Sequence, residues 1–505
     1  MEKYKNLAYK ISIFLILLFG IFIRIKLYLV SDVFEDDECR LGLSMFGKNV
    51  WQMFLPLGPL SSTPIFMFIS KIIADISNYN EYALKFLPFV FSILSLGLFY
   101  KICNEYFSRK ISTVISTYLF SVNLYAIYFS SIFKTYSLEI FISLLCLYYL
   151  PKINIANLNT KQVIITAASI AILPLISLPS LFFIGLFFLV NIFENYKNKT
   201  FYKKLGIICI PFLIIFATYY FVNLLPTKIM QMTGYSQLWQ DVYSIPLISG
   251  IVIILNSLLD PNNYVLCTFI TIISSTVYVI TTKQEHTKFN FYLYTILLST
   301  FFVNYFHLYP TAIGRTAVYM LPVLIIVLVK LIDVLRVKSI LFYIIVLFFV
   351  IGTYKYYLPS HLYQINDLTS KFRNYAPKSL LLELKEKYNV KTDYIIAPDA
   401  SLYSFCYYAE RMNFEHFSEK KYLEHINLIP VRIQDNSPQD TVWEVYNNLD
   451  PQYNYWFYLI KEYAGSNERA YTIEWLEKQN ILYKKQDKDS YLYYISGVKK
   501  VNYKN

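Results

Sequence analysis

Long apolar runs alternate with short polar segments over the first 357 residues of the chain. A helix that spans a membrane needs about 20 mostly apolar residues, and fewer where other helices enclose it. The pattern therefore predicts an α-helical polytopic membrane protein. About eleven spanning helices are expected, near residues 8–30, 82–103, 111–128, 131–150, 162–177, 179–194, 204–222, 262–281, 291–308, 316–335 and 339–357.

Composition and charge exclude two other classes of protein. Of the 505 residues, 56% are hydrophobic and 16% are charged, whereas soluble domains carry about 25% charged residues. The net charge of +12 belongs to residues 1–357, because residues 358–505 hold equal numbers of basic and acidic side chains. A basic excess confined to an apolar region is typical of a membrane protein. We therefore expect membrane lipids, and no nucleic acid, as partners.

The basic residues also predict the orientation in the membrane. The loops on the side of the N-terminus hold fifteen Lys and Arg, and the longer opposite loops hold five. Basic loops are retained in the cytoplasm. We expect a multi-pass protein of the plasma (inner) membrane, with its N-terminus in the cytoplasm. An odd number of spans then places residues 358–505 outside.

Two outer loops and the tail are long enough to fold. Residues 31–81 show apolar positions at helical spacing around Leu41, Met45, Val50 and Phe54, and again after Pro64, which predicts two interfacial amphipathic helices. The loop near residues 223–260 has a similar mixed character. In the tail we expect helices at 378–389 and 468–479 and strands at 394–396, 453–460 and 491–495. This alternation predicts a small α/β domain.

Four consecutive carboxylates, Glu35-Asp36-Asp37-Glu38, follow the first predicted span. Mutual repulsion and lost hydration beside a membrane are expected to raise the pKa of at least one of them. A carboxylate with a raised pKa is suited to act as a general base near neutral pH. The alternative is a solvated acidic loop that merely favours the outer side.

Four cations lie within predicted spans or at their outer ends: Arg24, Lys26, Lys134 and Arg315. Ionisable groups there are costly and often face a polar cavity. Arg24 and Lys26 can instead extend toward the lipid headgroups, and Lys134 can instead form a structural pair with Glu139. Arg315 follows Gly314 in a short outer loop, where a guanidinium can take a phosphate bidentately.

Other site motifs are missing from the sequence. The five histidines show no HExxH or clustered spacing, and there is no GxSxG turn or P-loop. The sequence therefore indicates no metal site, no nucleotide site and no cofactor.

The acidic pair and the cations carry a resemblance to a known family. The chain resembles the GT-C glycosyltransferases of the protein O-mannosyltransferase type (glycosyltransferase family 39-like), which include the bacterial transferases that add aminoarabinose to lipid A. The family has an Asp-Glu pair after the first span, an interfacial helix, a Pro-containing segment, a basic residue opening the fourth span, and Tyr-Pro and Gly-Arg near the last spans. The corresponding stretches are Asp37-Glu38-Cys39, Ser62-Thr63-Pro64-Ile65-Phe66, Tyr82-Ala83-Leu84-Lys85-Phe86-Leu87-Pro88, Tyr128-Phe129-Ser130-Ser131, Lys134-Thr135-Tyr136-Ser137-Leu138-Glu139, Tyr309-Pro310 and Gly314-Arg315.

The likeness covers residues 1–357 in order and spacing, with departures. Cys39 stands where the family usually has Ala, and Lys85 and Lys134 stand where Arg is common. The resemblance implies a transmembrane GT-C-like catalytic domain at residues 1–357 and an extracytoplasmic α/β domain at residues 358–505.

The resemblance also implies an activity. A protein of this kind would be a hexosyl- or pentosyltransferase. It would move a sugar from a polyprenyl-phosphate donor to a hydroxyl of a glycolipid, glycan or protein outside the membrane. Asp37 would be the general base of an inverting displacement and Glu38 its neighbour, while Lys134 and Arg315 would bind the donor phosphate. Asp36, Arg24 and Glu139 would support them.

Two other classes stay open. A glycan polymerase or ligase uses lipid-linked oligosaccharides in a similar helical bundle. A lipid or solute transporter would also explain the spans and buried charges, although the chain shows no inverted repeat.

Overall fold

The computed structural model describes residues 2–58, 62–234, 245, 249, 287–305, 314–334, 377–389, 391–412, 428–431, 439–459, 468–487 and 490–501. Contacts between residues divide the chain into two compact units. The first unit contains Met1–Leu29, Val50–Ile72 and Leu84–Asn366. The second contains Val30–Asn49, Ile73–Ala83 and Asp367–Asn505. Two segments of the predicted first outer loop therefore belong to the same unit as the tail. The domain boundary expected at residue 357 lies outside the described residues and stays a prediction.

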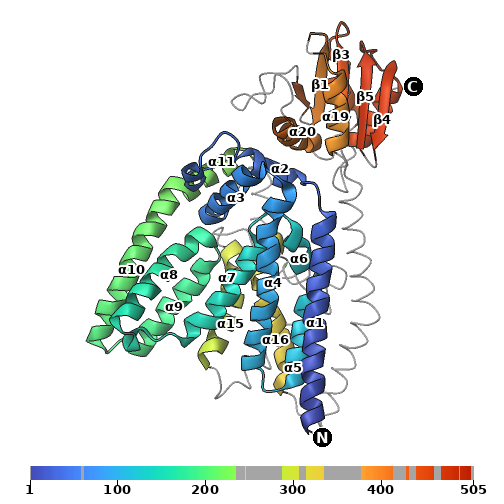
Figure 1. The fold of residues 1–505 in the computed structure, drawn as a ribbon. Helices are drawn as coiled ribbons and strands as arrows, with labels where there is room; N and C mark the ends of the chain where they lie inside the picture. Colours follow the sequence, from blue (N-terminus) through green and yellow to red (C-terminus); the bar gives the residue numbers. More distant parts are fainter. Residues whose placement is uncertain are drawn as a thin grey trace. The chain divides into compact units, whose positions relative to one another are not determined.

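The first unit is helical throughout its described residues. Figure 1 shows α8, α9 and α10 packed side by side. The elements that lie wholly or mainly in this unit are α1 (Glu2–Val30), η1 (Val50–Phe54), α3 (Pro64–Ser77), α4 (Glu81–Tyr106), α5 (Lys110–Val122), α6 (Leu124–Tyr128), η2 (Phe129–Ser131), α7 (Tyr136–Tyr149), η3 (Leu150–Lys152), η4 (Ile155–Asn157), α8 (Thr160–Ile176), α9 (Ser180–Asn195), α10 (Lys199–Tyr219), η5 (Tyr220–Leu224), α11 (Leu225–Gly234), α15 (Thr287–Tyr305), η6 (Gly314–Met320) and α16 (Leu321–Val334).

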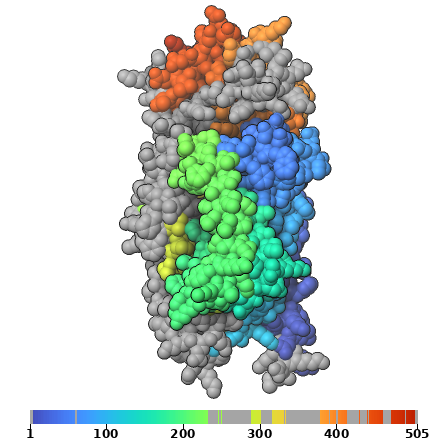
Figure 2. Space-filling model, turned by 90° about the vertical axis from the view of Figure 1, so that its left-hand side faces the viewer, coloured from blue at the N-terminus to red at the C-terminus, as the bar shows by residue number. Residues whose placement is uncertain are grey.

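Three helices in the described residues are long and apolar enough to cross a membrane: Asn6–Val30, Glu81–Tyr106 and Lys199–Gln231. A fourth candidate is the pair Lys110–Val122 and Leu124–Ser131, which is bent by 52°. The last of the three long helices contains α10, which runs along the face shown in Figure 2. Its side chains Ile210, Leu213 and Ile214 are each more than half exposed, as expected of a surface that faces lipid.

The helix pattern confirms several predicted spans and corrects others. The spans expected at 8–30, 82–103 and 204–222 are long apolar helices. The one at 111–128 is broken at Asn123, whose side chain caps α6 by accepting from the Ala126 N–H at 3.1 Å. A capped break of this kind is a strong local helix start. The helices at 162–177 and 179–194 are present but shorter than 18 residues, and the spans expected at 262–281 and 339–357 lie outside the described residues.

The interfacial helix expected through Leu41, Met45, Val50 and Phe54 is interrupted. The structure has a short α2 (Asp36–Leu43) and then the separate 3-10 helix η1. Gly47 lies between them with φ of 65°, and this left-handed conformation ends a right-handed helix. The second expected helix is confirmed as α3. The centre of the loop at 223–260, including Trp239, Gln240 and Asp241, lies outside the described residues.

The second unit contains a mixed five-stranded sheet in the order β2-β1-β3-β5-β4. β1 pairs in parallel with β2 and β3, and β5 pairs antiparallel with β3 and β4. The strands are β1 (Asp393–Pro398), β2 (Leu428–Val431), β3 (Asn454–Leu459), β4 (Ile481–Asp487) and β5 (Ser490–Ser496), and the tail helices are α19 (Pro377–Lys387), α20 (Asp399–Arg411), α21 (Gln439–Asn447) and α22 (Glu468–Glu477). All five tail elements predicted from the sequence are present.

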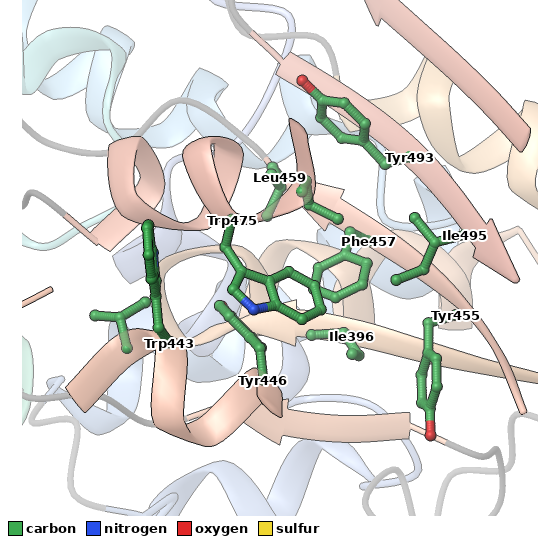
Figure 3. Packing of buried hydrophobic residues seen from close by; sticks show 11 residues of the cluster. Ile396, Trp443, Tyr446, Tyr455, Phe457, Leu459, Trp475, Tyr493 and Ile495 are labelled. Atoms are coloured by element: carbon green, nitrogen blue, oxygen red, sulfur yellow. The ribbon is translucent and has the colours of Figure 1, made fainter. Parts of the chain in front are cut away.

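The two faces of this sheet are covered by different helices. Phe457 of β3 packs with Tyr446 of α21 and Trp475 of α22 in one aromatic core (Figure 3). Successive side chains of a strand point to opposite faces, and Tyr458 accordingly meets Phe405 of α20, with ring centroids 5.6 Å apart. The face opposite to α21 and α22 therefore carries α20, which in turn packs against α2.

Candidate functional site

The acidic run forms the start of α2. Asp36, Asp37 and Glu38 are the first three residues of the helix. Glu38 is fully buried, and its Oε2 accepts the backbone N–H of Glu35 at 2.9 Å. This is the reciprocal half of a capping box, in which the third helical residue reaches back to the residue before the helix. The cap accounts for a buried carboxylate at Glu38.

Asp36 has a different partner. Its Oδ2 lies 2.8 Å from Nε of Arg40, one turn further along α2. The Arg40 guanidinium also lies over the ring of Tyr403 in α20, 3.9 Å from its centroid. Asp36 is thus held in an ion pair that is itself packed against the tail. Asp36 and Asp37 are both partly exposed, whereas Glu38 is buried.

The helix start adds an electrostatic effect that the sequence argument did not include. The unpaired N–H groups of the first turn place partial positive charge beside the three carboxylates. Four acids in a row are therefore less costly at this place than they would be in an irregular loop.

Lys134 and Glu139 belong to the start of α7 in the first unit. Lys134 is half-buried in the bend before the helix, and Glu139 is 5% exposed. The partner of Glu139 is the Thr135 hydroxyl, which donates to Oε1 at 2.8 Å, while Oε2 has no hydrogen-bond partner. The structural pair between Lys134 and Glu139 that the sequence left open is therefore wrong.

Arg315 lies on the neighbouring element η6 and is exposed. η6 packs against α7. Lys134 and Arg315 thus stand near the starts of two packed elements of the first unit. The acids of α2 belong to the second unit.

Arg24 has a structural set of contacts. The headgroup placement weighed from the sequence is wrong, because Arg24 is fully buried. Its Nε donates to Ser92 Oγ at 2.7 Å, and Nη1 donates to the carbonyls of Gly20 and Ser121, both at 2.9 Å. Ser121 is one residue from the end of α5, where carbonyls lack helical partners and a cation is favoured. Arg24 therefore stabilises the bend between α5 and α6.

The chain is similar to ArnT from Cupriavidus metallidurans. Its apo crystal structure superposes with a TM-score of 0.49 at 9% identity, covering 95% of this chain and 99% of that one. The structure of the same protein bound to undecaprenyl phosphate gives 0.48 and 10%, with the same coverage. No family model and no curated protein matches the chain.

Two buried lysines of the first unit were not among the predicted site residues. Lys71 in α3 is 5% exposed, and Lys85 near the start of α4 is fully buried. Lysine is rarely buried without a partner. Lys85 interrupts the apolar run of a predicted span, and this interruption is the signal in the sequence that could have identified it.

Within the described part of the chain, no group of three or more His, Cys, Asp or Glu side chains could hold a metal ion.

Proposed function

We propose that the protein is a membrane glycosyltransferase that moves a sugar from a polyprenyl-phosphate donor to an acceptor hydroxyl at the outer side of the plasma membrane. The apolar helices support a membrane-embedded enzyme that meets a lipid-linked donor. The acidic start of α2 supplies a base, and Lys134 and Arg315 supply positive charge. In this proposal the N-terminus is cytoplasmic, and residues 358–505 form the extracytoplasmic domain.

The reaction proposed is an inverting displacement at the anomeric carbon. The acceptor oxygen forms a bond to this carbon as the bond from the carbon to the phosphate oxygen breaks. Asp37 takes the proton of the acceptor hydroxyl, and the lipid phosphate leaves with both electrons of the broken bond. Base catalysis and charge stabilisation each lower the barrier of such a step.

The observation that carries this proposal is the different surroundings of the three carboxylates. A general base must reach an incoming hydroxyl. The Glu38 carboxylate is buried in the helix cap, and the Asp36 carboxylate is held by Arg40. Asp37 is partly exposed. The proposal assigns the proton transfer to Asp37 because Asp37-Glu38 stands where the resembled family has its Asp-Glu pair.

The phosphate sites follow from the chemistry of the leaving group. A phosphate monoester that leaves gains negative charge, which a guanidinium can bind bidentately and an ammonium as a point charge. Arg315 and Lys134 would have these two roles on the packed elements η6 and α7.

Replacing Asp37 by Asn tests the proposal. Asparagine keeps the size of the side chain but accepts no proton, and the loss of a general base costs about 10²–10⁴ in rate. The purified Asp37→Asn variant should fold and bind the polyprenyl-phosphate sugar but transfer it at a rate lower by this factor. Wild-type transfer by a folded variant would remove Asp37 from the mechanism.

A further inference from the structure

The helix that carries Asp37 is built onto the tail. Within the second unit, α2 packs along α20, although about 360 residues of sequence separate them. Gly42 of α2 meets the ring of Tyr407 so closely that a Cβ atom at Gly42 would lie 2.5 Å from Cε2 and 2.8 Å from Cδ2. Tyr407 is fully buried, so its ring has little room to move.

Two buried tyrosine hydroxyls of α20 form hydrogen bonds with the chain segments around Phe34 and Tyr79. The Tyr408 hydroxyl accepts the backbone N–H of Phe34, two residues before α2, at 2.9 Å. The Tyr407 hydroxyl donates to the carbonyl of Tyr79 at 2.9 Å. Burial raises the pKa of both hydroxyls well above the ordinary value of 10.0, so both remain neutral hydrogen-bonding groups.

A buried ion cluster holds the same two chain segments. Glu81 is 1% exposed, and its Oε1 lies 2.8 Å from Nζ of Lys378 and contacts the Arg411 guanidinium at the end of α20. The Lys378 ammonium also donates to the carbonyl of Asp32 at 2.9 Å. Breaking a buried pair leaves an uncompensated charge and is strongly destabilising. The tail therefore holds both residues 30–49 and residues 73–83.

We infer that α20 sets the position of the α2 helix, and hence of the Asp37 carboxylate, so that Tyr407, Tyr408 and Gly42 are positioning residues for transfer. This inference rests on the proposed function, in which Asp37 is the base. The tail then contributes to the chemical step through backbone and ring contacts, without placing a side chain of its own on the reacting atoms. Because the proposed phosphate cations belong to the first unit, displacement of α2 should lower kcat and leave KM for the donor unchanged.

Gly42→Ala is the direct test, because the added methyl group must push α2 away from Tyr407 without altering any carboxylate. A misplacement of 1 Å can cost about 10²-fold in rate, so we expect kcat to fall at least tenfold with unchanged donor KM. Gly97→Ala in α4 is the matched control, since nothing lies within 4 Å of a Cβ atom there. It should keep wild-type kcat.

The accessibility of Cys39 gives a readout that needs no activity. Cys39 lies in α2 and is fully buried, so its alkylation rate, followed by peptide mass spectrometry, reports separation of α2 from its packing. Gly42→Ala should raise this rate and Gly97→Ala should not. If Gly42→Ala does not fold, Tyr408→Phe takes its place as the test, because it removes only the hydroxyl that accepts the Phe34 N–H. Tyr455→Phe is its control, because that hydroxyl donates to Asp450 within the tail.

A second substitution tests whether the ring contact itself is responsible. Tyr407→Leu removes the ring atoms that the new methyl group would meet. The loss of activity in the Gly42→Ala/Tyr407→Leu variant should therefore be smaller than the sum of the losses in the two single variants. Additive losses would overturn the inference, as would wild-type kcat in folded Gly42→Ala while Asp37→Asn is inactive. Full transfer by Asp37→Asn would instead refute the proposed function, and the Cys39 rates would still report the packing.

Discussion

Asp36 and Asp37 are adjacent in sequence and differ in surroundings. Asp36 forms an ion pair with Arg40, and the Arg40 guanidinium lies over Tyr403. Asp36→Asn should therefore weaken the contact between α2 and α20 and lower transfer less than Asp37→Asn does. Steady-state transfer rates of the two purified variants make the comparison. The opposite ranking would move the proton transfer to Asp36.

Arg24 allows a second prediction for a single residue. Arg24→Met removes the donors to Ser92, Gly20 and Ser121, and one hydrogen bond from a charged group is worth about 1.5–3 kcal/mol. We expect destabilisation of this size in thermal unfolding in detergent, with unchanged donor KM. Lys26→Met is the control on the same helix, where the side chain is exposed and the expected change is within about 0.5 kcal/mol. A large rise in donor KM with unchanged stability would assign Arg24 to donor binding.

Sequence reasoning identified the residue types of the site better than their partners. The acidic run and the cation before α7 could be predicted because charge beside an apolar run is costly and conspicuous. The partners of Arg24 and Glu139 could not, because carbonyls at a broken helix end and a neighbouring Thr hydroxyl leave no signal in a hydropathy pattern.

At the scale of elements, the pairing of α7 with η6 predicts how Lys134 and Arg315 act. Lys134→Ala and Arg315→Ala should each weaken use of the donor, because a charge-assisted contact is worth about 1.5–3 kcal/mol, which is roughly tenfold or more in affinity. Donor-concentration curves of folded variants check this, with Lys228→Ala on α11 as a control cation outside these two elements. Wild-type donor dependence in both variants would show that the phosphate is bound elsewhere.

The contact between α19 and β4 predicts a pH dependence of the tail. Glu383 accepts from Tyr483 at 2.7 Å and pairs with Lys387 at 2.9 Å and Lys485 at 2.7 Å. Hydrogen bonds from Lys485, Lys387 and Tyr483 lower the pKa of Glu383 from 4.5 to about 2. A carboxyl whose folded pKa is below its unfolded value stabilises the folded state above the unfolded pKa, and this stabilisation is lost as pH falls toward the folded pKa.

Glu383→Gln should therefore destabilise the tail at pH 7, and its difference from wild type should shrink between about pH 4.5 and pH 2. Unfolding of the full chain followed by tryptophan fluorescence measures this, because Trp443, Trp456 and Trp475 lie in the tail. Glu386→Gln on the same helix is the control at an exposed position. A difference that stays constant down to pH 2 would contradict the lowered pKa of Glu383.

The tail contains elements that the hydropathy pattern did not predict, among them α20, β2 and β4. α20 is buried on nearly all sides, between the sheet and α2, so the pattern of a helix with one exposed polar face does not apply to it. β2 contains Pro430, which argues against a strand except at an edge, and β2 is indeed an edge strand. β4 is the opposite edge and is rich in polar residues, as protected edges are.

At the scale of the whole molecule, the division into units differs from a simple split between spans and tail. Residues 30–49 and 73–83 group with the C-terminal residues, although the sequence indicated only a helical loop followed by a span. The sequence could not show this, because the contacts join residues more than 300 positions apart, as Phe34 and Tyr408 illustrate. Alternating hydropathy predicts local elements and says nothing of such pairings.

The central claim is that the protein uses a lipid-linked sugar as donor. The most direct measurement incubates the purified protein in detergent, without any ion gradient, with a radiolabelled sugar on polyprenyl phosphate and a glycolipid, glycan or protein acceptor. It follows the free lipid phosphate and the label on the acceptor. We predict that wild-type protein releases lipid phosphate with turnover, and that Asp37→Asn releases it at a rate lower by about 10²–10⁴. If wild-type protein binds the donor and releases no lipid phosphate with glycolipid, glycan or protein acceptors, or if Asp37→Asn releases it as fast as wild type, the account is contradicted.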